Sequence, residues 1–376
     1  MPPENSPIQS AQPIQTNPTP ESAKPTKNRS SSFIILIIAL LVLAGLGYLL
    51  LNPSAPVVEK GPPITGLQVA LNTSTFLDKT LQANGGMLGG FECSQDFPER
   101  CKSFPLQETQ PHVGQAIFSY FMLSEATGDA SHREKADRAI NFVLDECDEE
   151  VIMCSWNFFP LANYYEKTGE EKYLTRGLLR PAEEFLALPH QDVVDANVGH
   201  KLASLYKATQ DERFKNRLLE VADAELERGL GTPGQSSQDI QVAWSVLIQA
   251  YKLTEDPKYL TAAEDFFDNY DIVGDLGDFS DPYSTLPAIK GADALLDLAE
   301  LSQDGEKYKE EAKALMQKML LNLWDTPEST KFTGDYGFVN VRVSSKTNKL
   351  TLNNGWIIKL FVRMADEQFN QPIVVM

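Results

Sequence analysis

The sequence predicts an all-α closed ring of about twelve helices that carries a small β-hairpin and follows a single transmembrane helix. Three observations lead to this fold class: an uncharged apolar run near the N-terminus, a helical hairpin pattern that recurs five times, and one segment that alternates with period two. The chain has 376 residues and a net charge of -19. Because proteins that grip nucleic acid need a basic face, we expect no nucleic-acid partner.

The first part of the chain differs in composition from the rest. Residues 1–32 are rich in Pro, Ser, Gln, Asn and Thr, so we expect a disordered tail. Residues 33–51 are uncharged and apolar, and as a helix they would extend about 28 Å, the thickness of a bilayer core. Basic residues precede this run and no charge follows it until Glu59, which predicts a cytoplasmic N-terminus. A cleaved signal peptide is the alternative.

The remaining chain is then expected outside the cell membrane, as a linker over residues 52–60 and an extracytoplasmic domain over residues 61–376. All four cysteines follow the apolar run, as expected for an oxidising compartment. Local pairing is the simplest of three connectivities, and four separate buried thiols are the alternative. The expected disulfides are Cys93 with Cys101 and Cys147 with Cys154.

Five segments share one pattern: an apolar helix, a short polar turn that opens with Thr or Ser, and a second helix that begins near an aromatic residue. Their interval of about 40 to 50 residues and their short turns predict stacked helical hairpins. The turns open at Thr127, Thr168, Thr209, Thr254 and Ser302. One helix near residues 66–82 and another near residues 354–369 flank the hairpins. Pairing of these two would close a ring, whereas an open solenoid would need polar end caps.

The segment FVNVRVSSKTNKLTL, residues 338–352, alternates apolar and polar side chains around a polar turn. This pattern is typical of a β-hairpin. Because the segment lies between the fifth helical hairpin and the final helix, we expect it at one rim of the ring.

The hairpin number, the period and the turn YEKTGEEKY at residues 165–173 resemble the (α/α)6 toroids of the six-hairpin glycosidase-like superfamily, over residues 61–376. This resemblance implies an (α/α)6 toroid whose site lies at the N-terminal ends of the inner helices. Most members act on carbohydrates, as hydrolases, lyases or epimerases. The fold also serves terpene cyclases and prenyltransferases, whose G-G-F signature is similar to residues 89–91. The tandem Asp-Asp of some mannan-degrading members is absent, so no catalytic motif carries over in full.

The five first helices, aligned on their Thr or Ser, predict which face lines the ring. Apolar residues stand four and seven positions before the mark, whereas polar and aromatic residues stand five, nine and twelve before it, on the opposite face. Aromatic rings can stack on sugar faces while polar groups bind hydroxyls. The alternative is an inverted ring with the polar face in solvent. The expected substrate-binding residues are Gln115, Trp156, Asn197, Trp244, Lys290, Asp297, Asn353 and Trp356.

Four residues are candidates for catalysis. A glycoside hydrolase needs two carboxyl groups roughly 5 to 10 Å apart. Asp293 on one inner helix could work with Asp195 or Asp239, which begin neighbouring inner helices, although helix capping is an alternative role for these two. A lyase or epimerase needs a base near neutral pH, for which His200 is the candidate.

These features predict a membrane-anchored, single-pass protein whose extracytoplasmic toroid cleaves or modifies a polysaccharide without a cofactor. The alternative is a non-catalytic toroid that binds a glycan or a protein at the cell surface. The acidic segment from Asp268 to Asp281 could bind calcium, with a solvated loop as the alternative, and no other metal site is expected. Nothing in the sequence indicates the oligomeric state.

Overall fold

The computed structural model divides the chain into two compact units, Met1–Val57 and Val58–Met376. Every residue that the structure describes belongs to the second unit. The described residues are 60–94, 102–103, 114–195, 197–231, 236–277, 279, 284–327, 336–339 and 346–372. Among them, no helix is long and apolar enough to cross a membrane. The apolar run at residues 33–51 and the expected tail lie outside the described residues, so the anchor stays a prediction.

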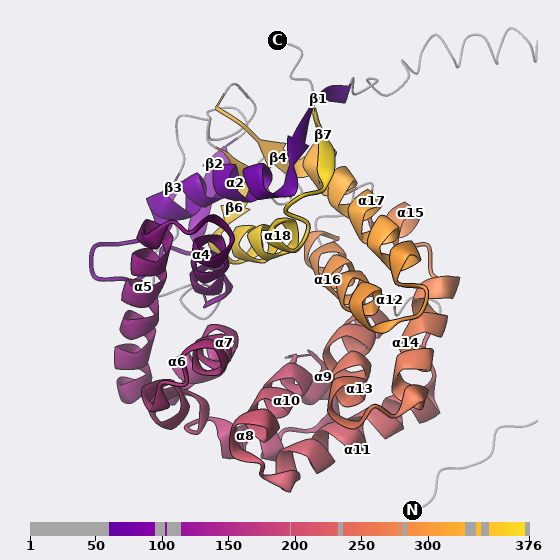
Figure 1. Cartoon of the computed structure of the whole chain (residues 1–376). Helices are drawn as coiled ribbons and strands as arrows, with labels where there is room; N and C mark the ends of the chain where they lie inside the picture. The colour runs from indigo at the N-terminus through magenta and orange to yellow at the C-terminus, as the bar shows by residue number, and fades with distance from the viewer. Residues whose placement is uncertain are drawn as a thin grey trace, which may run out of the picture. The chain divides into compact units, whose positions relative to one another are not determined.

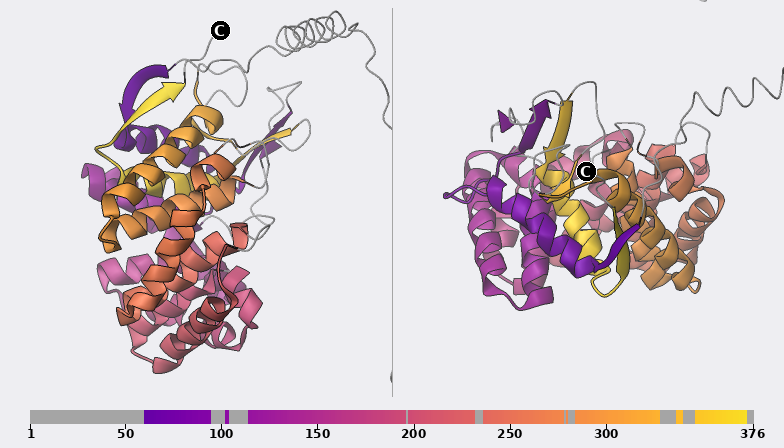
Figure 2. Two further views of the ribbon diagram at one scale, coloured as in Figure 1. Left: turned by 90° about the vertical axis from the view of Figure 1, so that its right-hand side faces the viewer. Right: turned by 90° about the horizontal axis from the view of Figure 1, so that it is seen from above.

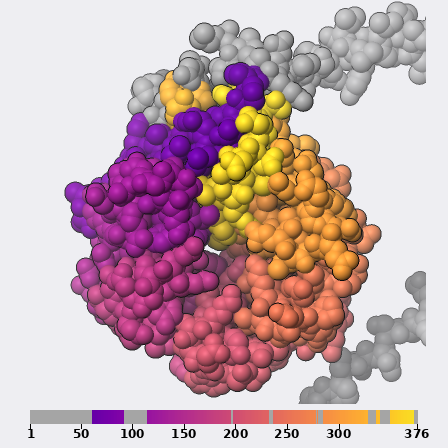
Figure 3. All heavy atoms as spheres, in the orientation of Figure 1, coloured from indigo at the N-terminus to yellow at the C-terminus, as the bar shows by residue number. Residues whose placement is uncertain are grey.

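Helices of the second unit form a ring with an inner and an outer layer (Figure 1). The inner layer consists of α4 (Gly114–Thr127), α7 (Phe158–Thr168), α10 (Val198–Thr209), α13 (Ile248–Thr254), α16 (Thr285–Leu301) and α18 (Thr351–Arg363). The outer layer consists of α2 (Gly66–Thr80), α5 (Ala130–Glu149), the π-helical turn η3 (Tyr173–Leu178) with α8 (Ala182–Ala187), α11 (Glu212–Arg228), α14 (Pro257–Asn269) and α17 (Gly305–Leu323). A space-filling view shows the ring hollowed at its centre (Figure 3).

Short helices connect the layers or extend the inner helices at their N-terminal ends. They are α6 (Val151–Trp156) before α7, α9 (His190–Asp195) before α10, α12 (Ser236–Val242) with the π-helical turn η4 (Ala243–Leu247) before α13, and α15 (Ile272–Leu276) before α16. Several inner helices therefore begin with a short extra segment, which adds side chains to one end of the ring.

The two ends of the unit close the ring. Helix α2 packs against α18, so the first and last helices make the sixth hairpin. Strand β1 (Lys60–Thr65) pairs antiparallel with β7 (Gln368–Pro372), with Ile64 opposite Phe369 (Figure 2). The backbone N–H of Gly66 donates to the carbonyl of Glu367 at 2.9 Å. The predicted closed ring is confirmed, and the strand pair that seals it is an addition that the sequence pattern did not reveal.

A recurring hydrogen-bond pattern explains the repeated Thr. The hydroxyl of Thr127 donates to the carbonyl of Leu123 at 2.7 Å and accepts from the N–H of Asp129 at 3.1 Å. The Asp129 carboxylate then accepts from the N–H of Ser131 at 2.8 Å and caps α5. Thr209 and Thr254 make the same two bonds, and Asp residues cap the helices that follow them. One side chain thus ends the inner helix and positions the residue that starts the outer helix.

The core lies between the two helical layers. Each apolar residue expected four or seven positions before a repeated Thr or Ser is fully buried. These residues are Tyr120, Leu161, Leu202, Leu247, Leu295, Leu123, Tyr164, Leu205, Ala250 and Leu298. The apolar face therefore packs against the outer helices, and the polar face looks into the ring.

The strands outside the β1–β7 pair lie at one rim. They are β2 (Gly90–Ser94), β3 (Lys102–Ser103), β4 (Trp324–Asp325), β5 (Gly337–Phe338) and β6 (Lys346–Leu350). The alternating segment 338–352 does supply strands, but their partners lie elsewhere: β6 pairs with β2, and β5 pairs with β4. Alternation identifies a strand and says nothing about its partner. A fully buried ion pair between Lys349 and Asp325, at 2.7 Å, links the two sheets.

Candidate functional site

A cavity of about 520 Å³ opens at the N-terminal ends of the inner helices. Five expected binding residues lie in its wall, each from a different inner helix or its extension: Gln115, Trp156, Asn197, Lys290 and Trp356. The first four stand twelve positions before a repeated Thr or Ser. The polar stripe therefore faces the interior, which excludes the inverted ring.

Aromatic side chains form the side and the floor of the cavity. Trp156 is 45% exposed at the rim. Deeper in the ring, Phe159, His200, Trp244 and Trp356 pack edge to face or tilted, with ring centroids 4.4 to 5.7 Å apart. We call these four residues the aromatic floor. Phe159 and Trp356 present one side to the cavity, whereas the expected binding residue Trp244 is buried and does not line it.

His200 is held within the aromatic floor rather than in the cavity wall. Burial lowers the pKa of its imidazole to about 3, so the ring is neutral at pH 7. Its Nε2 is buried and has no hydrogen-bond partner among the described residues. A group with such a pKa is a weak base near neutral pH, and this position does not favour the role expected of His200 in a lyase or epimerase.

Asp293 lies below the floor and is fully engaged. The Trp244 indole N–H donates to its Oδ2 at 3.0 Å, and Lys359 donates to the same oxygen at 2.7 Å. Arg363 pairs with Oδ1 at 2.8 Å. Burial alone would raise the pKa of Asp293, but the two cations outweigh it and hold the pKa well below its usual range. The carboxylate stays ionised and lines no part of the cavity, which argues against the expected role of general acid.

Asp297 and Asp239 are also ion-paired. Asp297 pairs with Lys252 at 2.8 Å and with Arg363 at 3.0 Å, and it does not line the cavity. Asp239 is fully buried, where it accepts from Arg228 at 2.7 Å and from the N–H of Gly231 at 2.8 Å. Its carboxylate ties the loop before α12 to the end of α11, which is a structural task.

Asp195 and Asn353 complete the expected residues. Asp195 is the last residue of α9 and stands two residues before the cavity residue Asn197. The side chain of Asp195 lies outside the described part of the chain. Asn353 is buried in α18 and is not part of the cavity wall.

Polar side chains are linked along one wall of the cavity. Lys290 donates to the amide oxygen of Gln241, and the Gln241 amide N–H donates to the side-chain oxygen of Asn197. Asn197 has φ 55°, a left-handed conformation that Asn tolerates, and begins α10. Across the cavity, the amide oxygen of Gln115 has no hydrogen-bond partner in the described residues. The wall thus offers fixed amides beside aromatic rings.

Two charged cavity residues were not expected from the sequence. Lys201 is 8% exposed, and its ammonium lies 4.9 Å from the centre of the Phe185 ring. Burial lowers the pKa of Lys201 to about 8. Glu184 on α8 accepts from the hydroxyl of Ser155 at 3.4 Å. Lys201 follows Asn197 by one helical turn, so helical spacing could have identified it, whereas α8 lies outside the repeat.

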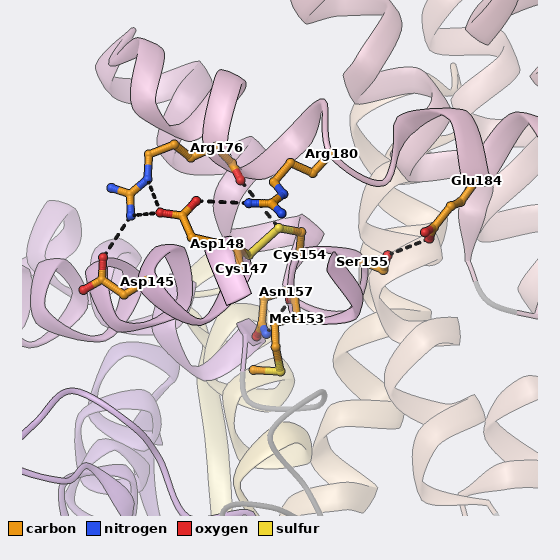
Figure 4. The surroundings of a disulfide bond; sticks show 10 residues. All are labelled: Asp145, Cys147, Asp148, Met153, Cys154, Ser155, Asn157, Arg176, Arg180 and Glu184. Atoms are coloured by element: carbon orange, nitrogen blue, oxygen red, sulfur yellow. Dashed lines mark hydrogen bonds and ion pairs between the residues drawn. A yellow bond between two sulfur atoms is a disulfide. The ribbon is translucent and has the colours of Figure 1, made fainter. Parts of the chain in front are cut away.

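A disulfide joins α5 to the short helix α6, on which the rim residue Trp156 lies; Figure 4 shows the surroundings of this bond. Cys147 at the end of α5 is bonded to Cys154 on α6, with Cα atoms 5.2 Å apart, which confirms one expected pair. Beside it, Arg176 donates to Asp148 at 2.6 Å and to Asp145 at 2.9 Å. The bond lies only two residues before Trp156, so it ties this end of α6 to α5. The structure does not describe the side chains of Cys93 and Cys101, so the second expected disulfide stays a prediction.

The acidic segment from Asp268 to Asp281, which was expected to bind calcium, lies only partly within the residues that the structure describes. Asp268 accepts from Lys307 at 2.6 Å and from Tyr308 at 2.8 Å. Asp271 accepts from the N–H of Gly274 at 2.8 Å and caps α15. Within the described ranges, no group of three His, Cys, Asp or Glu side chains could hold a metal ion. Asp278 and Asp281 lie outside them, so calcium binding stays a prediction.

No model of a protein family and no curated protein matches the sequence. Solved structures do match the fold. An unsaturated glucuronyl hydrolase specific for heparin matches with a TM-score of 0.61 and 16% identity, over 80% of this chain and 96% of that chain. The chain thus has the (α/α)6 toroid fold of the six-hairpin glycosidases.

Further toroids agree. Unsaturated glucuronyl hydrolase from Streptococcus agalactiae matches with a TM-score of 0.60 and 10% identity, over 81% of this chain and 93% of that chain. An inactive variant of α-1,6-mannanase GH76A of Salegentibacter sp. HEL1_6, in complex with α-1,6-mannotriose, matches with a TM-score of 0.59 and 13% identity, over 80% and 100%. At these identities the likeness establishes the toroid and transfers no residue roles.

Proposed function

We propose that this protein binds an oligosaccharide in the cavity at the N-terminal ends of the inner helices. One observation carries the proposal: Trp156, Trp356 and Phe159 provide ring faces in the same cavity as the amides of Gln115 and Asn197. Pyranose rings have an apolar face that stacks on aromatic rings and a rim of hydroxyls that needs donors and acceptors. The cavity volume of about 520 Å³ is within the range of ligand sites and has room for a short oligosaccharide.

The same cavity favours binding over cleavage. Glycoside hydrolysis needs a proton donor and a second carboxylate about 5 to 10 Å apart. Of the acids expected to act, Asp293 is paired with Arg363 below the aromatic floor and Asp239 is paired with Arg228. Asp297, which was expected to bind substrate, is paired with Lys252 and Arg363. Glu184 is the one carboxylate in the described wall. A non-catalytic glycan-binding toroid is therefore the first candidate.

Hydrolysis is the second candidate, and two observations support it. The solved toroids that resemble this chain include a glucuronyl hydrolase and an α-1,6-mannanase variant with bound mannotriose. In this chain, Asp195 stands two residues before the cavity residue Asn197. Glu184 and Asp195 are therefore the pair through which this cavity would cleave a glycosidic bond.

We further propose that the toroid is anchored outside the cell by the apolar run at residues 33–51. The bond between Cys147 and Cys154 supports an oxidising compartment, where disulfides persist. Non-reducing mass spectrometry of protein from the producing cell tests the compartment. A bonded pair is expected, and two free thiols in the freshly isolated protein would contradict it.

A screen of the purified full-length chain against neutral and acidic oligosaccharides separates the two candidates. Binding is followed by calorimetry and bond cleavage by release of reducing ends, in the wild type, Glu184→Gln and Asp195→Asn. Saturable binding without release supports the non-catalytic toroid. Release that disappears in either variant, with binding retained, supports the hydrolase. Absence of both binding and release would contradict the proposal that the cavity takes a glycan.

A further inference from the structure

Lys201 projects into the cavity without a counter-ion. Its side chain is buried, yet its ammonium makes no hydrogen bond or ion pair with any residue that the structure describes. The ammonium lies over the face of the Phe185 ring, 4.9 Å from the ring centroid, in a cation–π contact. Other cations of the domain differ: the buried Lys349 and the partly buried Lys359 and Arg363 each pair with a carboxylate.

The described wall of the cavity has more positively than negatively charged side chains, although the protein as a whole is acidic. Lys201 and Lys290 lie in its wall against a single described carboxylate, Glu184, whereas the whole chain has a net charge of -19. Lys290 is already engaged with Gln241, and Glu184 with Ser155. A local excess of positive side chains in an acidic protein attracts an anion.

Burial of an unpaired ammonium is unfavourable because the group gives up water without gaining a partner. An anionic group on a ligand would supply that partner in a setting of low dielectric constant, where the attraction is stronger than in water. A negative group on a ligand beside Lys201 would therefore improve the electrostatics of the protein.

We propose that the oligosaccharide bound in this cavity is anionic, and that its carboxylate, sulfate or phosphate pairs with Nζ of Lys201. This inference rests on the proposed function and narrows it to a class of ligand. The aromatic rings would hold the sugar face, and Lys201 would select glycans that carry a negative group near the stacked ring.

The pairing makes binding depend on pH in a defined direction. The pKa of Lys201 is about 8 in the free protein, so the amine is mostly protonated at pH 7 and loses its charge above pH 8. The charged groups nearest in the cavity wall are Glu184 on α8 and Lys290 on α16, and His200 on the same helix is neutral at these pH values. Affinity for an anion should therefore fall as pH rises through and above 8.

The test uses the full-length chain and four trisaccharides with one backbone: neutral galactotriose, its galacturonate form, and its sulfated and phosphorylated forms. Affinities are measured by calorimetry at pH 6.5 and pH 9. At pH 6.5 at least one anionic form should bind at least tenfold more tightly than the neutral sugar, and the three anionic arms separate carboxylate from sulfate and phosphate. This preference should shrink at pH 9.

Three variants locate the effect. Lys201→Met should abolish the preference for the anionic forms over the neutral sugar, whereas Lys201→Arg should retain this preference. Lys207 is an exposed lysine on the same helix, and Lys207→Met removes the same charge outside the cavity, so it should leave the preference and the neutral-sugar affinity unchanged. Equal affinity of the wild type for all four sugars would overturn the inference and leave the proposed function standing. Binding of none of the four would contradict both.

Discussion

The cavity and the centre of the ring are built from the same polar face of the inner helices, but they differ in how their charged side chains are paired. Below the aromatic floor, Asp293 and Asp297 share the guanidinium of Arg363. Above the floor, Lys201 and the Gln115 oxygen have no partner in the described residues. The comparison teaches that facing the ring is not enough to make a functional residue. A side chain must also lack a partner inside the protein.

Depth along the helix separates the two regions. Four of the five residues that stand twelve positions before the repeated Thr or Ser line the cavity, and those five before it lie about 10 Å deeper, at 1.5 Å per residue. The residues nine before the mark contribute Phe159 and His200 to the floor between them. The aromatic floor therefore divides the polar stripe in two: the side chains above it line the cavity, and the carboxylates below it are ion-paired.

Removal of Arg363 tests the paired region and has the largest expected effect. Arg363→Met should lower the free energy of unfolding by about 3–5 kcal/mol, because two buried carboxylates lose their shared cation. Lys201→Met in the cavity should cost less than about 1 kcal/mol, since no carboxylate loses a partner. Urea denaturation at pH 7 measures both. An equal loss of unfolding free energy in the two variants would contradict the claim that the centre of the ring is ion-paired and the cavity is not.

Removal of the disulfide should affect the cavity and spare the centre. The double variant Cys147→Ser, Cys154→Ser should lower the free energy of unfolding by about 2.5 kcal/mol, as expected for release of a short loop. Glycan affinity should fall as well, because α6 carries Trp156. Calorimetric titration beside urea denaturation separates the two effects. Unchanged affinity would show that α6 needs no covalent support to hold the rim.

The aromatic floor should make stability depend on pH through His200. The pKa of His200 is about 3 in the folded protein and about 6.5 in the unfolded chain, so the unfolded chain binds the proton more readily. The full stability is present above pH 6.5 and declines as pH falls toward 3. Between pH 7 and pH 5 the loss should be about 2 kcal/mol. Urea denaturation of His200→Phe should show a flatter dependence of stability on pH, and an unchanged slope would contradict an imidazole that stays neutral in the folded protein.

The smallest expected effect on the free energy of unfolding is that of replacing Trp156, and Trp244 is the matched comparison. Trp156→Ala should change the free energy of unfolding by less than about 0.5 kcal/mol, because the ring is 45% exposed at the rim. Trp244→Ala should be clearly destabilising, since that ring is buried and donates to Asp293. Thermal unfolding of the two variants checks the order. A large loss in Trp156→Ala would mean that the rim is part of the core.

The sequence predicts much of this molecule because the repeat is local. The Thr or Ser at the end of five of the six inner helices sets the register, so the buried columns, the closure of the ring and the position of Trp156 and Asn197 follow from spacing alone. The ion pairs do not follow. Arg363 on α18 reaches Asp293 on the neighbouring inner helix α16, and no pattern within one hairpin indicates which cation faces which acid. For the same reason, the pairing of β6 with β2 is absent from the alternation that predicts β6.

The most direct test of glycan binding in the cavity is an equilibrium titration of the full-length chain and of Trp156→Ala with neutral and anionic oligosaccharides at pH 7. Stacking on the rim predicts saturable binding by the wild type and at least a tenfold weaker affinity in the variant, which should remain as stable as the wild type. Equal affinity in the two proteins would contradict a sugar site in this cavity.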